Sequence, residues 1–349
     1  MMIEIDGSLH SGSGTILRYA TSLATLKRES LHMTRIRAKR PKPGLRAQHL
    51  RALSACAELC GGRIETAHVG SQEITYHPGT SLEGGSFHIE IGTAGSAAML
   101  AFTLIPLALF SSAPTELTIL GGLFQDFAPS FFHMDRVLVR VLRAMGANIT
   151  MRMDRPGYVP EGQGILFMRV SPCRALKPIR LTEQGTVQLV KGIALSSHLR
   201  DQAVSSRMAR RSSHLLEQKG FFSNIDVLDD DSAVQRGAAL ILWAETTTGC
   251  VLGADRAGKQ GRKSEDIADY VVRSLVEDLA SGACTDRHLA DQLILFAALA
   301  EGTSEFTIPL VTDHVEANLW LVEHILGVRH RIRGNLVTLE GIGMRSAVS

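Results

Sequence analysis

The chain has 349 residues, of which 45% are hydrophobic and 21% charged, so it is long enough for two domains or for one large domain with an insertion. Its formal net charge of +2 excludes binding to a polyanion through a generally basic surface, and leaves only local clusters for that purpose. The five cysteines include no CxxC pair, which predicts a cytoplasmic protein in a reducing compartment. The longest apolar run, 97–110, is too short to span a bilayer. We therefore expect no membrane contact, and nothing indicates an obligate protein partner.

One pattern of helices and strands occurs three times along the chain. In the first copy, a glycine-containing turn opens an apolar helix at about 14–27, and a strand follows at 31–38. A second helix, 46–60, ends at a pair of glycines, and strands near 63–69 and 72–76 complete the copy. Each copy can bury one face of its helices against a sheet.

The second and third copies follow the same layout. The second begins at the turn Gly92–Ser96 and contains a helix after that turn, a strand at 116–120, a helix at 130–144 and strands near 147–153 and 165–170. The third stands at the C-terminal end and contains a helix at 289–300, a strand at 305–308, a helix at 314–326 and strands near 328–333 and 336–339. Repetition at this scale indicates a fold built from similar units.

An additional block, roughly 178–272, separates the second copy from the third. Its predicted elements are a strand near 185–195, a helix near 199–218, strands at 238–244 and 250–253, and a helix at 264–279. The arginines of the first helix (200, 207, 210 and 211) fit an RNA track or, more simply, a solvated helix face.

The predicted fold is α/β, with three repeated βαβαββ-like units and a smaller inserted α/β domain. The predicted domains are 1–177 for units one and two, 178–272 for the insert, and 273–349 for unit three.

The segment 35–51 carries seven cationic side chains and no acidic one. It begins in a predicted strand, passes through Pro41, Pro43 and Gly44, and enters a predicted helix. The N-terminus of a helix offers backbone N–H donors and a dipole that favours an anion. The segment therefore predicts a phosphate-binding turn, although a solvated loop explains the same charges.

Two polar motifs stand at the starts of predicted helices. His314 follows Thr312 and Asp313, which are favourable N-cap residues, and an imidazole there can act as a nucleophile or as a general acid or base. Asp291 and Gln292 open an apolar helix, where they can bind a purine edge or a ribose, or simply cap the helix.

The glycine-rich opening 6–14 allows close approach of the backbone to a phosphate, but it matches neither the P-loop nor the dinucleotide fingerprint. A similar turn at 92–96 indicates that such glycines also serve the repeated fold.

Taken together, these motifs resemble the RNA 3′-terminal phosphate cyclase family over nearly the whole chain. The most specific matches are 37–50, Gly92–Ser96, 288–292, and Thr312–His314 with Asn318. The resemblance implies repeated units like those in the C-terminal domain of a translation initiation factor. It also implies an ATP-dependent enzyme that converts an RNA 3′-phosphate to a 2′,3′-cyclic phosphate through a covalent histidine–AMP intermediate.

The resemblance also implies roles for individual residues. His314 falls at the position of the nucleophile. Asp291, Gln292 and Pro129 fall where the family holds adenosine. The residues that fall where it meets the phosphates of ATP and the RNA 3′ end are Gly14, Arg18, Arg37, Arg40, Gln48 and His49. ATP and a divalent metal, Mg²⁺ or Mn²⁺, are the implied cofactors.

The chain departs from the family pattern near the expected metal and substrate positions. Ser11 stands where the family has a metal-binding Glu, Thr15 replaces a Gln, and Phe102 replaces another Gln. Ala317 stands for a Thr near His314. These departures leave two alternatives to the cyclase reaction. The first is transfer of AMP from the same histidine to a different phosphate or acid, and the second is a non-catalytic, cyclase-like RNA-binding protein.

Overall fold

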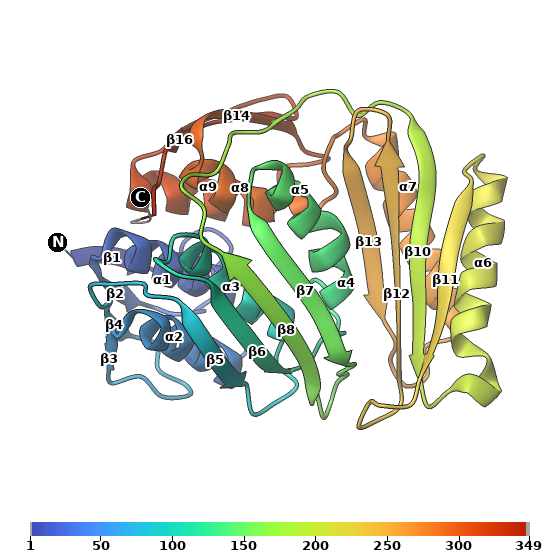
Figure 1. The fold of residues 1–349 in the computed structure, drawn as a ribbon, viewed down its shortest axis with the longest axis horizontal. Coiled ribbons are helices and arrows are strands. Elements are labelled where there is room, and N and C mark those ends of the chain that lie inside the picture. The colour runs from blue at the N-terminus through green and yellow to red at the C-terminus, as the bar shows by residue number, and fades with distance from the viewer. Residues whose placement is uncertain (1, 347–349) are drawn as a thin grey trace.

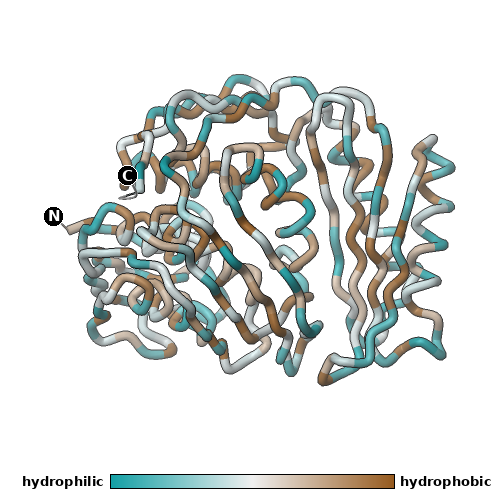
Figure 2. Tube along the Cα trace, in the orientation of Figure 1, coloured by the Kyte–Doolittle hydropathy of each residue, from teal (hydrophilic) through white to brown (hydrophobic). Residues whose placement is uncertain are grey.

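The structure is a computed structural model that describes residues 2–346, and it has the predicted mixed α/β architecture. Figure 1 shows a larger part, in which three groups of strands surround helices, and a separate sheet at the right that is flanked by α6 and α7. In Figure 2, hydrophobic stretches run along the central strands of that sheet. No helix within residues 2–346 is long and apolar enough to cross a membrane.

Each of the three units contains the same order of elements. Unit one comprises β1 (Met2–Asp6), α1 (Gly14–Lys27), β2 (Ser30–Thr34), α2 (Ala47–Cys60), β3 (Arg63–Glu65) and β4 (Ile74–His77). Unit two comprises β5 (Gly85–Glu90), α3 (Ala97–Leu109), β6 (Thr115–Gly121), α4 (Phe131–His133), the π-helical turn η1 (Met134–Leu138), α5 (Val139–Ala144), β7 (Asn148–Arg155) and β8 (Gly164–Ser171). Unit three comprises β9 (Arg180–Leu181), α8 (Leu289–Leu299), β14 (Glu301–Thr307), α9 (Asp313–Leu326), β15 (Arg329–Arg333) and β16 (Leu336–Ile342).

The sheets of the three units share one topology. Their strand orders are β1-β2-β4-β3, β5-β6-β8-β7 and β9-β14-β16-β15. In each, the first two strands are parallel and the remaining pairs are antiparallel. A parallel pair needs a long crossover connection, which α1 and α3 supply in units one and two. In unit three the crossover from β9 to β14 contains α8 and, before it, the whole inserted sheet.

The inserted sheet has its own elements and its own core. These are β10 (Val187–Ser197), η2 (Arg200–Gln202), α6 (Val204–Gln218), β11 (Ser223–Asp230), β12 (Gly237–Thr246), β13 (Val251–Ala257) and α7 (Ser264–Ala280). The strand order is β11-β10-β12-β13. Buried side chains of β10, β12, β13, α6 and α7 form a hydrophobic cluster separate from the main core. The division at residues 178 and 272 stays a prediction, and β9 lies in the sheet of unit three although it falls inside the range 178–272.

Two arginines of α6 form ion pairs with carboxylates of α7. Arg207 donates two hydrogen bonds to Glu265 on α7 at 2.8 and 2.7 Å, and Arg211 forms a similar pair with Asp269. These two guanidinium groups are already paired with carboxylates. The interpretation of the arginines as a solvated helix face therefore fits them better than the interpretation as an RNA-binding track.

Local differences from the predicted elements have clear causes. Strand β2, predicted at 31–38, ends at Thr34, because its partner β4 begins at Ile74, which pairs with Met33. Residues 35–40 form turns instead, with positive φ at Arg35 and Arg37. The strands β5 and β11 have no counterpart among the predicted strands, since both lie at sheet edges and are largely exposed.

A buried ion pair joins the insert to units two and three. Asp286 is fully buried, and its Oδ1 accepts hydrogen bonds from the N–H groups of His288 and Leu289, both at 2.8 Å. Its Oδ2 accepts from the N–H of Gly253 on β13 at 2.9 Å and lies 3.2 Å from Nε2 of His133. Burial alone would raise the pKa of Asp286, but the charge and hydrogen bond of His133 lower it to about 2. Burial opposes the charged ring of His133, yet the Asp286 carboxylate raises the pKa of His133.

We expect Asp286→Asn to lower the free energy of unfolding by about 2 kcal/mol near pH 5–6, because a hydrogen-bonded buried charge pair is lost. The lowered pKa of Asp286 stabilises the fold above the carboxyl's ordinary value of 3.8, and this contribution disappears as the pH falls toward 2. The raised pKa of His133 stabilises the fold below 6.5, and this contribution disappears as the pH rises through the folded pKa. Urea unfolding across pH should show the largest difference from wild type between these limits, whereas a constant difference would contradict the ion pair.

Candidate active site

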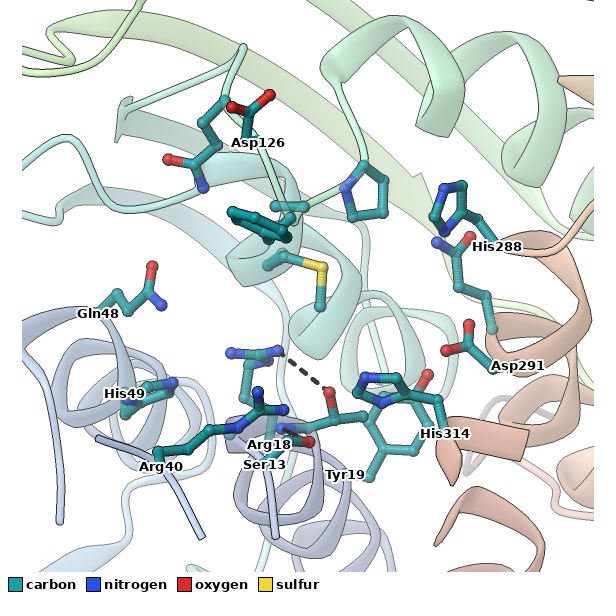
Figure 3. A pocket seen from close by; sticks show the side chains of 18 of the residues that line it. Ser13, Arg18, Tyr19, Arg40, Gln48, His49, Asp126, His288, Asp291 and His314 are labelled. Carbon is teal, nitrogen blue, oxygen red and sulfur yellow. Dashed lines mark hydrogen bonds between the residues drawn. The ribbon is translucent and has the colours of Figure 1, made fainter. Parts of the chain in front are cut away.

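A cavity of about 720 Å³ opens between the three units and the inserted domain. The ten site residues predicted from the sequence all line it: Gly14, Arg18, Arg37, Arg40, Gln48, His49, Pro129, Asp291, Gln292 and His314. They come from units one, two and three, and Figure 3 shows several of them around one space. Their chemical roles stay predictions, but the fold brings all of them to one place.

Five helices begin at this cavity. Gly14 opens α1, and Gln48, Met99, Asp291 and His314 lie in the first turns of α2, α3, α8 and α9. The first turns of α1, α2 and α3 contain no acidic residue, so the positive ends of those helix dipoles are not neutralised locally. The convergence of helix N-termini favours a ligand with negative charge.

Arg18 places a buried positive charge in the cavity wall. The side chain is 8% exposed, and within residues 2–346 its Nε has no hydrogen-bond partner. Its only hydrogen bond there is a long one, 3.5 Å from Nη2 to the hydroxyl of Thr15, drawn as a dashed line in Figure 3. Burial lowers the pKa of Arg18 to about 10, so the group stays charged at neutral pH. A buried cation without a carboxylate partner is costly unless an anion completes it.

His314 lies in the first turn of α9, which begins after the N-cap Thr312. The Thr312 hydroxyl accepts a hydrogen bond from the N–H of Val315 at 3.2 Å, which fixes the start of the helix. Burial, followed by the charges of Arg40 and Arg18, lowers the pKa of His314 below its ordinary value. The imidazole is therefore neutral at pH 7, with a lone pair available for nucleophilic attack. Arg37 and Arg40 of the cationic segment 35–51 line the same cavity as this ring.

The cationic turn uses part of its charge to hold its own shape. Arg37 donates from Nη1 to the backbone oxygens of Lys42 and Gly44 at 2.8 and 2.6 Å. Burial, then the charges of Arg46 and Arg40, lowers the pKa of Arg37. Arg37 thus both closes the turn and lines the cavity. Figure 3 shows Arg40 directed toward Ser13 and Arg18.

His49 is a neutral, positioned imidazole at the start of α2. It is 3% exposed, and its Nδ1 accepts a hydrogen bond from the N–H of Arg46 at 3.2 Å. Burial and the charges of Arg18 and Arg37 lower the pKa of His49 to about 2. A Cβ added at Gly14 would lie 2.1 Å from Nε2 of this ring. The glycine at the start of α1 is therefore required by the position of His49.

We expect Gly14→Ala to lower the free energy of unfolding by about 1–3 kcal/mol, since overpacking outweighs the better helix propensity of alanine. Urea unfolding measures this cost. In a His49→Ala background the clash is absent, so the same substitution should cost much less. An equal cost in both backgrounds would show that the clash with His49 is not the cause.

Asp291 lies on the opposite side of the view in Figure 3 from Gln48 and His49, and Gln292, the next residue of α8, also lines the cavity. Burial, together with the nearby carboxylate of Asp286, raises the pKa of Asp291 to about 7. The side-chain oxygen of Gln292 is buried and has no hydrogen-bond partner in the described part of the chain. The carboxyl and the amide thus offer both donors and acceptors to a ligand at this end of the cavity.

The inserted domain supplies part of the wall that was not predicted. Arg262 donates to both carboxylate oxygens of Asp126 at 3.0 and 2.8 Å, and Asp255 accepts from the N–H of Ser130 at 2.8 Å. These contacts fix the loop 125–129 across the cavity from Arg18. The lining residues not predicted as site residues are Ser13, Thr15, Tyr19, Met99, Gln125, Asp126, Phe127, Ala128, Asp255, Arg256, Tyr270 and His288. Of these, Ser13 and His288 stood in motifs that the sequence analysis singled out, 6–14 and 288–292, and Thr15 was named there as a departure from the family pattern.

The chain is similar to known proteins over nearly its whole length. A family model described as RNA 3′-terminal phosphate cyclase matches residues 9–332. The chain belongs to the RNA 3′-terminal phosphate cyclase family. A protein named RNA 3′-terminal phosphate cyclase from Pyrobaculum neutrophilum is 33% identical, over 98% of this chain and 99% of the relative. Proteins of the same name from Methanopyrus kandleri and Archaeoglobus fulgidus are each 34% identical, over 95% and 97% of this chain and 96% and 100% of theirs.

This member of the cyclase family places its departures from the family pattern in different environments. Phe102 is buried in the core, where its ring stacks on Tyr19 at 5.3 Å and meets Phe296 edge-on at 5.6 Å. The hydroxyl of Ser11 pairs with that of Ser13 at 3.0 Å. Thr15 lines the cavity, whereas Ala317 is fully buried. Neither Ser11 nor Phe102 lines the cavity.

Proposed function

We propose that this protein is an ATP-dependent RNA 3′-terminal-phosphate cyclase that works through a covalent His314–AMP intermediate. The observation that carries the proposal is a neutral imidazole in the same cavity as the guanidinium groups of Arg18 and Arg40. Family membership, together with the names of relatives of nearly equal length, supports this reaction. The partners of the reaction are ATP and the 3′ ends of RNA.

The proposed first step forms one bond and breaks another at the α-phosphorus of ATP. The lone pair of an imidazole nitrogen of His314 attacks phosphorus, and the bond to the bridging oxygen breaks, with its electrons leaving on pyrophosphate. The lowered pKa of His314 keeps the ring unprotonated for this step. Arg18 and Arg40 offset the negative charge that accumulates in the transition state.

Two further transfers follow in the proposal. An oxygen of the RNA 3′-phosphate attacks the phosphorus of the His314 adduct and restores the free imidazole. The neighbouring 2′-hydroxyl then attacks the activated 3′-phosphorus, and AMP leaves as the cyclic phosphate closes. Arg37, Gln48 and His49 are the proposed contacts for the RNA end. In such phosphoryl chemistry, positioning and charge neutralisation contribute most of the acceleration.

Adenosine is proposed to bind beside Asp291 and Gln292, away from the proposed contacts of the RNA end. The side-chain oxygen of Gln292 has no hydrogen-bond partner within residues 2–346, and the carboxyl of Asp291 lines the same cavity. Pro129 provides an apolar surface for a base. A purine edge or a ribose matches this mixture of donors and acceptors.

The cavity does not fit a resident metal ion held by protein side chains. Across residues 2–346, no three His, Cys, Asp or Glu side chains gather in a metal-binding arrangement. Asp126 is engaged by Arg262, and Asp255 by the backbone of Ser130. A divalent Mg²⁺ or Mn²⁺ that arrives bound to the triphosphate needs few protein ligands and stays a prediction. No proposed step depends on it.

A second candidate keeps the His314–AMP step but transfers AMP to a different phosphate or acid. It is favoured by the departures that the family resemblance implies, Ser11 in place of a Glu and Phe102 in place of a Gln, because these changes remove groups expected to act near the acceptor. A purely RNA-binding role is less compatible with a neutral His314 beside two arginines.

Incubating 3′-phosphorylated RNA with ATP, Mg²⁺ and the protein tests the first candidate. Conversion to an end that resists phosphatase supports it. Adenylylated protein without such RNA conversion supports the second candidate, and no adenylylation at all supports a binding role.

A further inference from the structure

Phe127 is the most exposed large hydrophobic residue of residues 2–346, with a relative exposure of 107%. It lines the cavity together with Arg18, Arg37 and His314. An aromatic ring surrounded by water loses the favourable burial that normally stabilises it. Its presence beside a cationic cavity, rather than in the core, calls for a ligand that covers it.

The backbone presents this ring instead of letting it fold inward. Phe127 has a φ of 65°, a left-handed conformation that is strained for a bulky residue and persists only where the surroundings enforce it. The surroundings do so on both sides. Asp126 is held by the bidentate pair with Arg262, and Ser130 is held by Asp255. Pro129 further restricts the backbone conformation of Ala128, the residue that precedes it.

We propose that Phe127 is a stacking platform for the terminal base of the RNA 3′ end, a role that rests on the function proposed above. Single-stranded RNA is bound by cationic grooves for its phosphates and by aromatic side chains for its unstacked bases. The cavity has the first in Arg18, Arg37 and Arg40, and Phe127 supplies the second. Stacking tolerates any base, so the residue contributes affinity for an RNA end without selecting its sequence. A platform held rigidly loses little entropy on binding.

Kinetics of Phe127→Ala, Phe127→Leu and Phe127→Tyr test this role. We expect Phe127→Ala to raise the KM for 3′-phosphorylated RNA about 5- to 150-fold, the range for one base–aromatic stack. Phe127→Leu should not restore it, whereas Phe127→Tyr should. Formation of the protein–AMP adduct from ATP alone should stay at the wild-type rate. Phe222→Ala, at another ring that is 83% exposed but outside the cavity, is the matched control and should change nothing.

An RNA whose terminal nucleotide lacks its base provides the decisive comparison. With that substrate, wild type and Phe127→Ala should have the same KM. An unchanged KM of Phe127→Ala for normal RNA would overturn the proposal, and so would an equal rise in its KM for abasic RNA. A matching fall in the rate of adduct formation would also overturn it, because the ring would then contact adenosine. It is also overturned if Phe127→Ala abolishes self-association of the protein in sedimentation, because the ring would then be covered by a second copy of the chain rather than by RNA.

A binding measurement keeps this inference separate from the proposed reaction. RNA with 2-aminopurine at its 3′ terminus loses fluorescence when that base stacks on an aromatic ring. We expect quenching with wild type and little with Phe127→Ala. If wild type forms no cyclic ends but still quenches through Phe127, the proposed reaction fails and the stacking role stands. If the probe is not quenched by wild type, the stacking role fails.

Discussion

Replacing His314 by asparagine should abolish the protein–AMP adduct and lower RNA cyclisation by at least about 10³-fold, the order of effect seen when a covalent nucleophile is removed. Asparagine keeps a polar side chain at the start of α9 but has no lone pair comparable to that of imidazole. Among residues 2–346, Nδ1 of His314 has no hydrogen-bond partner, so the described structure makes no internal hydrogen bond at that atom. Stability should therefore change little while activity is lost. Labelled ATP, followed by denaturing separation, measures the adduct.

The matched control for this substitution lies on the same helix. His324→Asn changes an exposed histidine of α9 that lies away from the cavity, and it should leave both adduct and cyclisation intact. If His314→Asn retained a normal adduct, another residue would be the nucleophile. Equal losses in both variants would instead indicate that helix α9 is disturbed.

Replacing Arg18 by methionine should lower kcat/KM for ATP by about 30- to 1,000-fold, which corresponds to the roughly 2–4 kcal/mol lost with one preorganised donor in a transition state. Methionine preserves much of the side-chain volume but removes the charge and the planar fork. Arg18→Lys should recover only part of the loss, because an ammonium keeps the charge without bidentate geometry. Steady-state kinetics with ATP and RNA measure both variants.

The same substitution should leave the fold at least as stable as wild type. Arg18 is a buried cation with an unpartnered Nε and no carboxylate hydrogen-bonded to it in the described structure, and replacing such a charge by an apolar group removes a desolvation cost. Lost activity with unchanged or increased resistance to urea would assign Arg18 to ligand binding. A parallel loss of stability would assign it to the fold. Arg210→Met, at an exposed position on α6, is the control.

The side of the cavity that is formed by helix starts could be predicted, because its residues carry local signals. Gly14, Gln48, Asp291 and His314 each stand where a predicted turn gives way to a predicted helix, so the sequence alone identifies them as helix starts. That five such starts meet in one cavity depends on the packing of three units, which no local signal reports. The family resemblance supplied the expectation that they meet.

The side of the cavity that is formed by loop 125–129 and the inserted domain could not be predicted in the same way. Asp255 and Tyr270 come from the inserted domain, and their place beside loop 125–129 follows from long-range pairs such as Arg262 with Asp126. The strand β9 has two residues, too few for any periodicity, and is recognised only by its pairing with β14. These features are tertiary properties of the chain.

The central claim, that His314 carries the adenylate, is tested most directly by locating the modification. The wild-type protein is incubated with ATP and Mg²⁺, digested under conditions that preserve an acid-labile phosphorus–nitrogen bond, and its peptides are analysed by mass spectrometry. The account predicts one AMP on the peptide that contains His314, attached to the imidazole. AMP on a different residue, or an unmodified His314 peptide under conditions in which RNA is cyclised, would contradict it.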